Sequence, residues 1–242
     1  MKSQFIYMNN SEIDKPIYKV LKFDYLIDML RNNRNTLINP SEWQELDPFE
    51  NLFLNSKIEF KSGITLQSEL GKSVFCQSWS YTKESDAIWR IYSPDKNSVK
   101  ISSTPRKLFN SLFSIDNNIN KVFIGKVKYL KSIDLKKLYH DNSKKWVLEE
   151  NGIGNCKTLL YKRYPFKHEN EVRLVYNTFE NFNETLLKYE LNPKEIIDNI
   201  VFDPRINYSD FKVRKNIIKD LGYNKSIIKS NLYKLPIYNT IK

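Results

Sequence analysis

The stretch that decides the fold reads Lys167-His168-Glu169-Asn170-Glu171-Val172-Arg173-Leu174-Val175-Tyr176. Successive side chains of a strand alternate between its faces, so Val172, Leu174 and Tyr176 would share one face and Glu169, Glu171 and Arg173 the other. Two carboxylates and a guanidinium are costly to bury unless they pair or serve a function. The pattern predicts the floor of a polar cleft. The alternative is an edge strand with a solvated cross-strand ion pair.

Composition indicates a folded, soluble protein. Of the 242 residues, 40% are hydrophobic and 14% aromatic, which excludes a disordered chain. The mean hydropathy is -0.56, and no apolar run has the length of a membrane helix. Internal repeats, Gly/Ser linkers and low-complexity tracts are absent from the sequence. We therefore predict a single domain over residues 1–242 with no membrane partner, and leave the oligomeric state open.

Cysteine and histidine usage points to a reducing compartment. The two cysteines, Cys76 and Cys156, form no ligand-like spacing, and the first ten residues lack the apolar run of a signal peptide. The two histidines, His140 and His168, are too few for a histidine-rich metal centre. We predict a cytoplasmic protein with no structural disulfide and no resident metal.

Positive charge is the one outlier in composition. The chain carries 39 Lys+Arg and 28 Asp+Glu, a net charge of +11, which favours binding to polyanions such as nucleic acid. An A+T-rich coding sequence would also enrich lysine and asparagine. The densest basic stretch covers residues 121–145, where we expect phosphate contacts if nucleic acid binds, or an ordinary solvated face if it does not.

The order of expected elements favours an α+β fold. Strands are expected at 17–20, 36–38, 74–80, 97–102, 121–130, 167–176, 186–191, 199–202 and 226–229. Helices are expected at 21–32, 84–92, from Thr104-Pro105 onward, at 156–164 and at 208–221, and Asp47-Pro48-Phe49-Glu50 has the pattern of a capped helix start. The sequence shows no regular βαβ alternation and no glycine-rich nucleotide loop, so a central mixed or antiparallel sheet flanked by helices is predicted.

Two further segments carry candidate ligand-binding groups. In the expected strand at 75–80, Ser78 and Ser80 lie on one face with Cys76, opposite Phe75 and Trp79. Hydroxyl groups both donate and accept hydrogen bonds, so this face suits a ligand or, equally, solvent.

The second segment is Asp86-Ala87-Ile88-Trp89-Arg90-Ile91-Tyr92, read as a helix. Ile88, Ile91 and Tyr92 then form a core face. Arg90 is a candidate phosphate ligand, and its alternative is an ion pair with Asp86 four residues earlier.

The combination of these segments resembles a widespread bacterial family of domains of unknown function. The resemblance rests on Tyr18-Lys19, Pro40 to Trp43 leading into Asp47-Pro48-Phe49-Glu50, Phe75-Cys76-Gln77-Ser78, Trp89 with Tyr92, and Glu169-Asn170-Glu171-Val172-Arg173. It spans most of the chain and implies a shared fold rather than an activity.

A more distant similarity is to ADP-ribosyltransferases. Their signatures are a basic residue on the first strand, a Ser-x-Ser strand and a Glu-x-Glu strand. Lys19, Ser78-Trp79-Ser80 and Glu169-Asn170-Glu171 occur here in that order. Lys19 departs from the Arg or His of those enzymes. This similarity implies a split sheet, NAD as substrate, and a protein or nucleic acid as acceptor.

The similarity also implies a role for each residue. Glu171 would stabilise the oxocarbenium-like state formed when the nicotinamide glycosidic bond breaks, and Glu169 would orient or deprotonate the acceptor. Ser78 and Ser80 would hold Glu171 and the nicotinamide ribose, with Lys19 gripping the dinucleotide. Tyr18 and Trp79 are candidates for stacking, or else core residues. Arg173 would position the carboxylates or contact the phosphates.

Two other functions stay open. One is a basic nucleic-acid-binding protein or a Mg²⁺-dependent nuclease that uses Asp47, Glu169 and Glu171. The other is a non-catalytic module in a toxin or anti-phage system. Convergence of Lys19, Ser78 and Glu171 on one cleft beside a split in the sheet would favour the transferase, whereas clustering of the three acids would favour the nuclease.

Overall fold

The computed structural model describes residues 4–43, 49, 57–59, 62–63, 65–67, 73–147, 149, 152–178 and 184–235. Its strands are β1 (Phe5–Ile6), β2 (Ile17–Lys22), β3 (Arg34–Ile38), β4 (Lys57–Glu59), β5 (Thr65–Gln67), β6 (Val74–Ser80), β7 (Ser98–Ser103), β8 (Val122–Lys126), β9 (Lys128–Leu130), β10 (Tyr161–Arg163), β11 (Glu171–Asn177), β12 (Leu186–Glu190), β13 (Asn199–Phe202) and β14 (Ser226–Lys229). Its α-helices are α1 (Asn10–Ile13), α2 (Phe23–Asn32), α4 (Asp86–Tyr92), α5 (Pro105–Asp116), α6 (Ser132–Val147), α7 (Ile153–Thr158), α8 (Pro193–Ile196) and α9 (Tyr208–Asp220). Two 3-10 helices, η2 (Pro40–Trp43) and η3 (Tyr164–Glu169), complete the elements.

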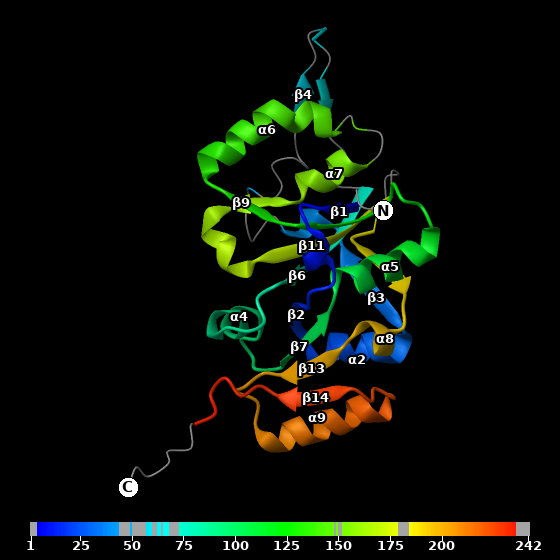
Figure 1. The fold of residues 1–242 in the computed structure, drawn as a ribbon, viewed down its shortest axis with the longest axis vertical. Helices are drawn as coiled ribbons and strands as arrows, with labels where there is room; N and C mark the ends of the chain where they lie inside the picture. Colours follow the sequence, from blue (N-terminus) through cyan, green and yellow to red (C-terminus); the bar gives the residue numbers. More distant parts are fainter. Residues whose placement is uncertain are drawn as a thin grey trace.

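A mixed sheet runs through the described part of the molecule. Its main path is β1-β8-β11-β6-β2-β7-β13-β14, and β3 and β12 are attached beside β6. Figure 1 shows the spatial order of these strands in the sheet, from β1 and β11 in the upper half to β13 and β14 at the lower end. Helices lie on both sides of the sheet, so the expected α+β architecture is confirmed.

The sheet splits between β6 and β2. On its other side β6 pairs with β11 over seven residues, and β2 pairs with β7 over six. Between β6 and β2 the register contains one pair, Tyr18 with Ser80. Beyond it the two strands diverge, and β6 makes a further single pair with β3, Ile38 with Cys76. The sheet therefore consists of two well-paired halves joined at one backbone contact.

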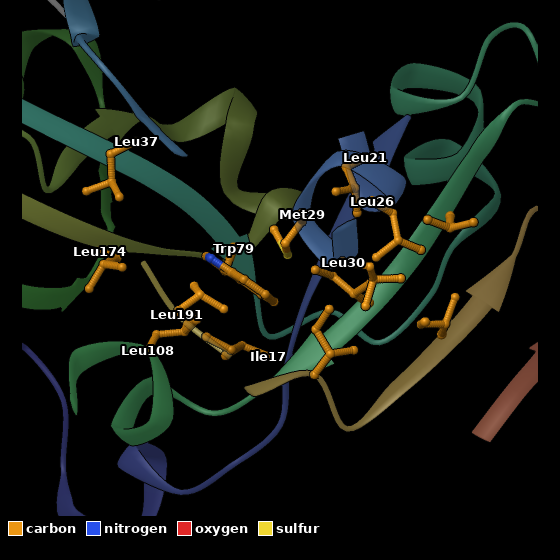
Figure 2. Close-up of a cluster of buried hydrophobic side chains, with 14 of the residues drawn as sticks. Ile17, Leu21, Leu26, Met29, Leu30, Leu37, Trp79, Leu108, Leu174 and Leu191 are labelled. Carbon is orange, nitrogen blue, oxygen red and sulfur yellow. The ribbon is translucent and has the colours of Figure 1, made fainter. Parts of the chain in front are cut away.

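One face of the sheet carries the larger core. Phe75 and Trp79 of β6 and Val172 and Leu174 of β11 point into it, as the alternation predicted. Figure 2 shows how Trp79 lies among aliphatic side chains such as Ile17, Leu108 and Leu191. The indole nitrogen of Trp79 donates to Gln77 at 2.8 Å, which satisfies the one polar atom of this buried ring.

The opposite face is covered in two parts. Cys76 and Val175 pack with Leu159, Leu160 and Cys156 beside α7, while α4 covers β2 on the other half of the sheet. Both cysteines are buried, and no disulfide joins them. Because β11 lies between β6 and β8 and is buried on both faces, it is a central strand. The alternative of a solvated edge strand is therefore wrong.

Several predicted boundaries need correction. β11 begins at Glu171, because Asn170 adopts a left-handed conformation and Glu169 ends the preceding 3-10 helix. The expected strand at 121–130 is two strands that diverge at Val127, with β8 pairing to β11 and β9 pairing to β10.

The expected helix at 156–164 is instead α7 followed by β10. Residues 161–163 are drawn into strand pairing with β9, a tertiary contact that local propensity does not encode. The capped helix expected at Asp47-Pro48-Phe49-Glu50 falls on residues of which all but Phe49 lie outside the described part of the chain. Within the described residues, no helix combines the length and apolar character that crossing a membrane requires.

Candidate functional site

A cavity of about 420 Å³ opens where the sheet splits, between α4 and η3. It brings together seven of the eight candidate site residues: Tyr18, Lys19, Ser78, Ser80, Glu169, Glu171 and Arg173. They come from β2, β6, β11 and the end of η3, so no single sequence segment builds the cavity. The predicted convergence of Lys19, Ser78 and Glu171 beside a split is thus what the structure shows.

Glu171 and Arg173 form a buried bidentate ion pair in the cavity floor. Arg173 Nε and Nη2 donate to Glu171 Oε1 and Oε2, each at 2.9 Å. Arg173 Nη1 also donates to the Leu159 carbonyl at 2.8 Å, and only 1% of the arginine is exposed. The pair fixes the plane of the Glu171 carboxylate, because two parallel hydrogen bonds leave it no rotation.

The surroundings keep Glu171 charged despite its burial. Burial raises the pKa of the Glu171 carboxyl. Arg173, and after it Lys162 and the hydroxyl of Ser78, lower the pKa by more than burial raises it, so the pKa lies below its ordinary value. A buried carboxylate that is negative at neutral pH suits stabilisation of positive charge developing in a ligand.

Glu169 is held at the side of the cavity by two elements. Its Oε2 accepts from Lys162 Nζ of β10 at 2.7 Å, and its Oε1 accepts from the Tyr92 hydroxyl of α4 at 3.2 Å. Lys162 Nζ also lies 3.7 Å from Glu171 Oε2. Glu169 therefore connects the wall formed by η3 to the wall formed by α4.

The two serines of β6 serve different contacts. The hydroxyl of Ser78 is one of the influences that lower the pKa of the Glu171 carboxyl, and its expected role in holding that residue stays a prediction. The Ser80 hydroxyl donates to the Glu169 carbonyl and accepts from the Thr82 amide at 2.9 Å. Its direct contact is thus with the backbone before β11, so its structural contribution is to position that turn.

Lys19 and Tyr18 lie on the β2 side of the split. Lys19 Nζ donates to the Ser78 carbonyl at 3.1 Å, which bridges the diverging strands. Burial lowers the pKa of Lys19 to about 8, against the opposing influence of Glu171. The Tyr18 ring lies 5.7 Å from Nζ of Lys100, a buried lysine that also lines the cavity and binds Glu84 at 3.3 Å.

Arg90 lies outside the cavity lining, so its expected part in the site needs correction. It pairs with Asp86 at 2.8 Å on the solvated face of α4, which is the alternative that the i,i+4 spacing offered. The core face expected on this helix is also wrong in part: Trp89 is fully buried, whereas Ile91 and Tyr92 are half-exposed at the cavity.

The nuclease alternative depends on Asp47, which lies outside the described residues. Among the residues that the structure does describe, no group of three or more His, Cys, Asp or Glu side chains is placed to hold a metal ion. The carboxylates of Glu169 and Glu171 are each engaged by a cation. That alternative stays a prediction.

The basic stretch 121–145 divides between paired and exposed lysines. Lys121 binds Asp116 at 2.9 Å and Lys126 binds Glu12 at 2.7 Å. Lys136 and Lys137, in contrast, are exposed on α6 and make no ion pair with any described residue. The exposed lysines of this stretch are thus on α6, whereas Lys126 of β8 is paired.

Sequence reasoning missed the most central cation of the site, Lys162. It was assigned to a helix, whereas in β10 it alternates with Tyr161 and points to the cavity. Phe166 and His168 of η3 and Lys100 of β7 were also missed as lining residues. No local motif marks them, because the parallel pairing of β10 with β9 brings η3 to the cavity.

Comparison with known proteins gives a family model and several remote structures. A family described as a protein of unknown function (DUF2971) matches residues 88–174, which include Lys162, Glu169 and Glu171. No curated protein matches the sequence.

Three solved structures are similar at a remote level. Thermus sp. 2.9 DarT in complex with NAD+ is 11% identical, covering 93% of this chain and 97% of that one, with a TM-score of 0.41. The same protein in complex with ADP-ribosylated ssDNA is 11% identical, covering 94% and 97%, with a TM-score of 0.42. Thermosipho africanus DarTG in complex with ADP-ribose is 11% identical over 89% of this chain and 50% of that one, with a TM-score of 0.38.

Proposed function

We propose that this protein is an ADP-ribosyltransferase-like enzyme that cleaves the nicotinamide glycosidic bond of NAD. The observation that carries the proposal is the convergence of Glu171, Ser78 and Lys19 on one cavity at the split between β6 and β2. These residues come from three strands far apart in the sequence. They are the same three positions that match the Glu-x-Glu, Ser-x-Ser and first-strand signatures of that enzyme class.

Glu171 is assigned to stabilise the reaction's transition state. As nicotinamide leaves, positive charge develops on the ribose ring carbon and oxygen, and a fixed carboxylate nearby lowers the energy of that state. Arg173 holds the carboxylate in one orientation, so little reorganisation is needed during the reaction. Lys19 is assigned to the anionic part of the dinucleotide, and Tyr18 to contact with one of its rings.

Glu169 is assigned to the acceptor. It lies nearer the mouth of the cavity than Glu171, with 15% of its side chain exposed against 7%. A carboxylate in that position can accept a proton from an incoming hydroxyl or amine as the new bond to the ribose carbon forms.

The acceptor that the charges favour is a nucleic acid. Exposed basic and aromatic residues of η3 lie at this cavity, with Lys167 placed 5.2 Å from the ring of Tyr164 and His168 in the cavity lining. Cations bind backbone phosphates and an exposed ring stacks with an unpaired base. The net charge of +11 adds a long-range attraction to such an acceptor.

The proposal is tested by incubating the purified protein with NAD and measuring nicotinamide release, alone and with single-stranded DNA, RNA or a protein mixture. We expect Glu171→Gln to lose about 3 kcal/mol of transition-state stabilisation, a rate loss of roughly a hundredfold or more. Glu190→Gln, an exposed carboxylate of β12 outside this cavity, is the matched control and should keep the wild-type rate.

Circular dichroism and urea unfolding must show that the variants are folded, because Glu171→Gln removes the counter-charge of a buried arginine. Labelled NAD then reports which acceptor gains ADP-ribose. Two results would overturn the proposal: a folded wild type that releases no nicotinamide with any acceptor, or a folded Glu171→Gln protein with undiminished turnover.

A further inference from the structure

One lysine lies between the two carboxylates of the site. Lys162 Nζ is 2.7 Å from Glu169 Oε2 and 3.7 Å from Glu171 Oε2, with 10% of the lysine side chain exposed. Arg173 engages Glu171 from its other side. Two anions and two cations therefore alternate along the cavity floor in the order Glu169, Lys162, Glu171, Arg173.

The fold holds Lys162 in this position through its neighbours. β10 pairs in parallel with β9, Lys162 beside Tyr129, and the preceding Tyr161 points away into a separate cluster where its ring stacks on Trp146 at 5.5 Å. The hydroxyl of Tyr161 also lies 2.5 Å from that of Tyr7. The Lys162 ammonium lies 4.7 Å from the centre of the Phe166 ring. A strand anchored on both sides of the lysine leaves its side chain one direction, toward the carboxylates.

The position of Lys162 between two carboxylates has an electrostatic consequence. Each of two neighbouring carboxylates disfavours the charge of the other, so a cation placed between them stabilises the charged pair. Arg173 compensates the charge of Glu171. Glu169 is bound by Lys162 and by the neutral hydroxyl of Tyr92, and Lys162 also lies 3.7 Å from Glu171, so the lysine is a cation that the two carboxylates share.

We propose that Lys162 is a positioning residue of the site, which holds Glu169 and Glu171 side by side as a pair of negative charges facing the cavity. The inference rests on the proposed function for its catalytic consequence, since a reaction that needs both carboxylates would need the lysine between them. Lys162 itself need not touch the dinucleotide.

The first measurement is independent of activity. Carbon-13 labelling of glutamate carboxyls follows the titration of Glu171 by NMR in wild type, Lys162→Met and Lys162→Arg. We expect the titration midpoint of Glu171 to rise in Lys162→Met and to return toward wild type in Lys162→Arg. Lys188→Met, an exposed lysine of β12 outside this cavity, is the control and should leave the midpoint unchanged.

Neighbouring groups must be included when these titrations are interpreted. Among the described residues, the charged or titratable groups that interact with Glu171 or line its cavity are Arg173 of the same strand, Lys162 of β10, Tyr129 of β9, Tyr18 and Lys19 of β2, Lys100 of β7, Tyr92 of α4, and Glu169 and His168 of η3. Assignment of the Glu171 signal by its loss in Glu171→Gln separates it from Glu169.

The second measurement is nicotinamide release as a function of NAD concentration and pH. We expect Lys162→Met to lower kcat at least about tenfold with KM changed less than about threefold, to move the acidic limb of the pH profile upward, and to be rescued in large part by Lys162→Arg. If Lys162→Met does not fold, Lys162→Gln takes its place.

The outcomes separate the two proposals. A wild type that releases no nicotinamide defeats the proposed function, while the titration still decides whether Lys162 governs the charge of Glu171. A folded Lys162→Met protein with an unchanged Glu171 midpoint overturns the inference about Lys162, whatever the activity. A folded Lys162→Met protein whose kcat and pH profile equal those of the wild type would also overturn the inference about Lys162.

Discussion

Replacing Arg173 by alanine is the sharpest test of how the cavity floor is built. Arg173 is 1% exposed and makes the two hydrogen bonds to Glu171 and a third to the Leu159 carbonyl. The substitution leaves a buried carboxylate without its closest cation, and a buried carbonyl without one of its donors. Breaking a buried pair in this way costs about 3–5 kcal/mol, a large share of the stability of a typical domain.

The loss should depend on pH, and the sign follows from the pKa of Glu171. In the wild type this pKa is below its unfolded value, so Glu171 contributes stability above the unfolded pKa that is lost as pH falls through the folded pKa. Without Arg173, burial dominates and raises the folded pKa above the unfolded one. Glu171 then becomes protonated in the folded mutant, so the cost of Arg173→Ala should be smaller near pH 4.5 than at pH 7.

The assay is urea unfolding of wild type and mutant at those two pH values. The matched control is Arg34→Ala, because Arg34 makes a similar bidentate contact with Asp28 at 2.9 to 3.1 Å but both side chains are more than one third exposed. An exposed pair contributes about 1 kcal/mol or less. Equal losses for the two arginine variants, or a loss at Arg173 that is the same at both pH values, would refute the reasoning.

Three further expectations follow from other parts of the molecule. Burial lowers the pKa of Lys19 from the ordinary 10.5 to about 8. Because the unfolded chain then binds this proton more tightly than the folded protein, the urea midpoint of the wild type should rise between pH 8 and 10. This rise should be absent in Lys19→Met. Gly125→Ala places a Cβ atom 2.3 Å from Leu160 Cδ1, and should lower stability by about 1–3 kcal/mol, measured by thermal unfolding. Reversing the charge of the exposed Lys136 and Lys137 should reduce the slope of log K against log salt for binding to single-stranded DNA, whereas an unchanged slope would exclude α6 from the contact.

The sequence allowed prediction of the residues that alternate within one strand. The faces of β11 and β6 follow from period-two patterning, so the placement of Glu171 and Arg173 opposite Val172 and Leu174 could be predicted before the fold was known. The pairing of Glu171 with Ser80 and of Arg173 with Ser78 then follows from adjacency of the two strands, which alternation alone does not specify.

Features that depend on tertiary contacts were harder to predict from the sequence. β10 was expected as the end of a helix, and its three residues become a strand because β9 is available as a partner. α6 was missed because, among its described residues, Leu135 and Trp146 are the only buried apolar ones, and two such residues are too few to give a clear helical period. The sequence therefore indicated neither that Lys162 lies in a strand nor that it lines the cavity.

The single backbone contact between Tyr18 and Ser80 has a consequence for motion. Each half of the sheet has its own continuous ladder, so the halves can rotate about this contact without breaking hydrogen bonds within either. The width of the cavity is then limited by the core that packs across the split, where Trp79 lies beside Ile17, and by side-chain hydrogen bonds across the gap such as Lys19 to Ser78. Amide hydrogens of β2 and β6 that face the gap should exchange faster than those facing β7 and β11, and a ligand that fills the cavity should slow them.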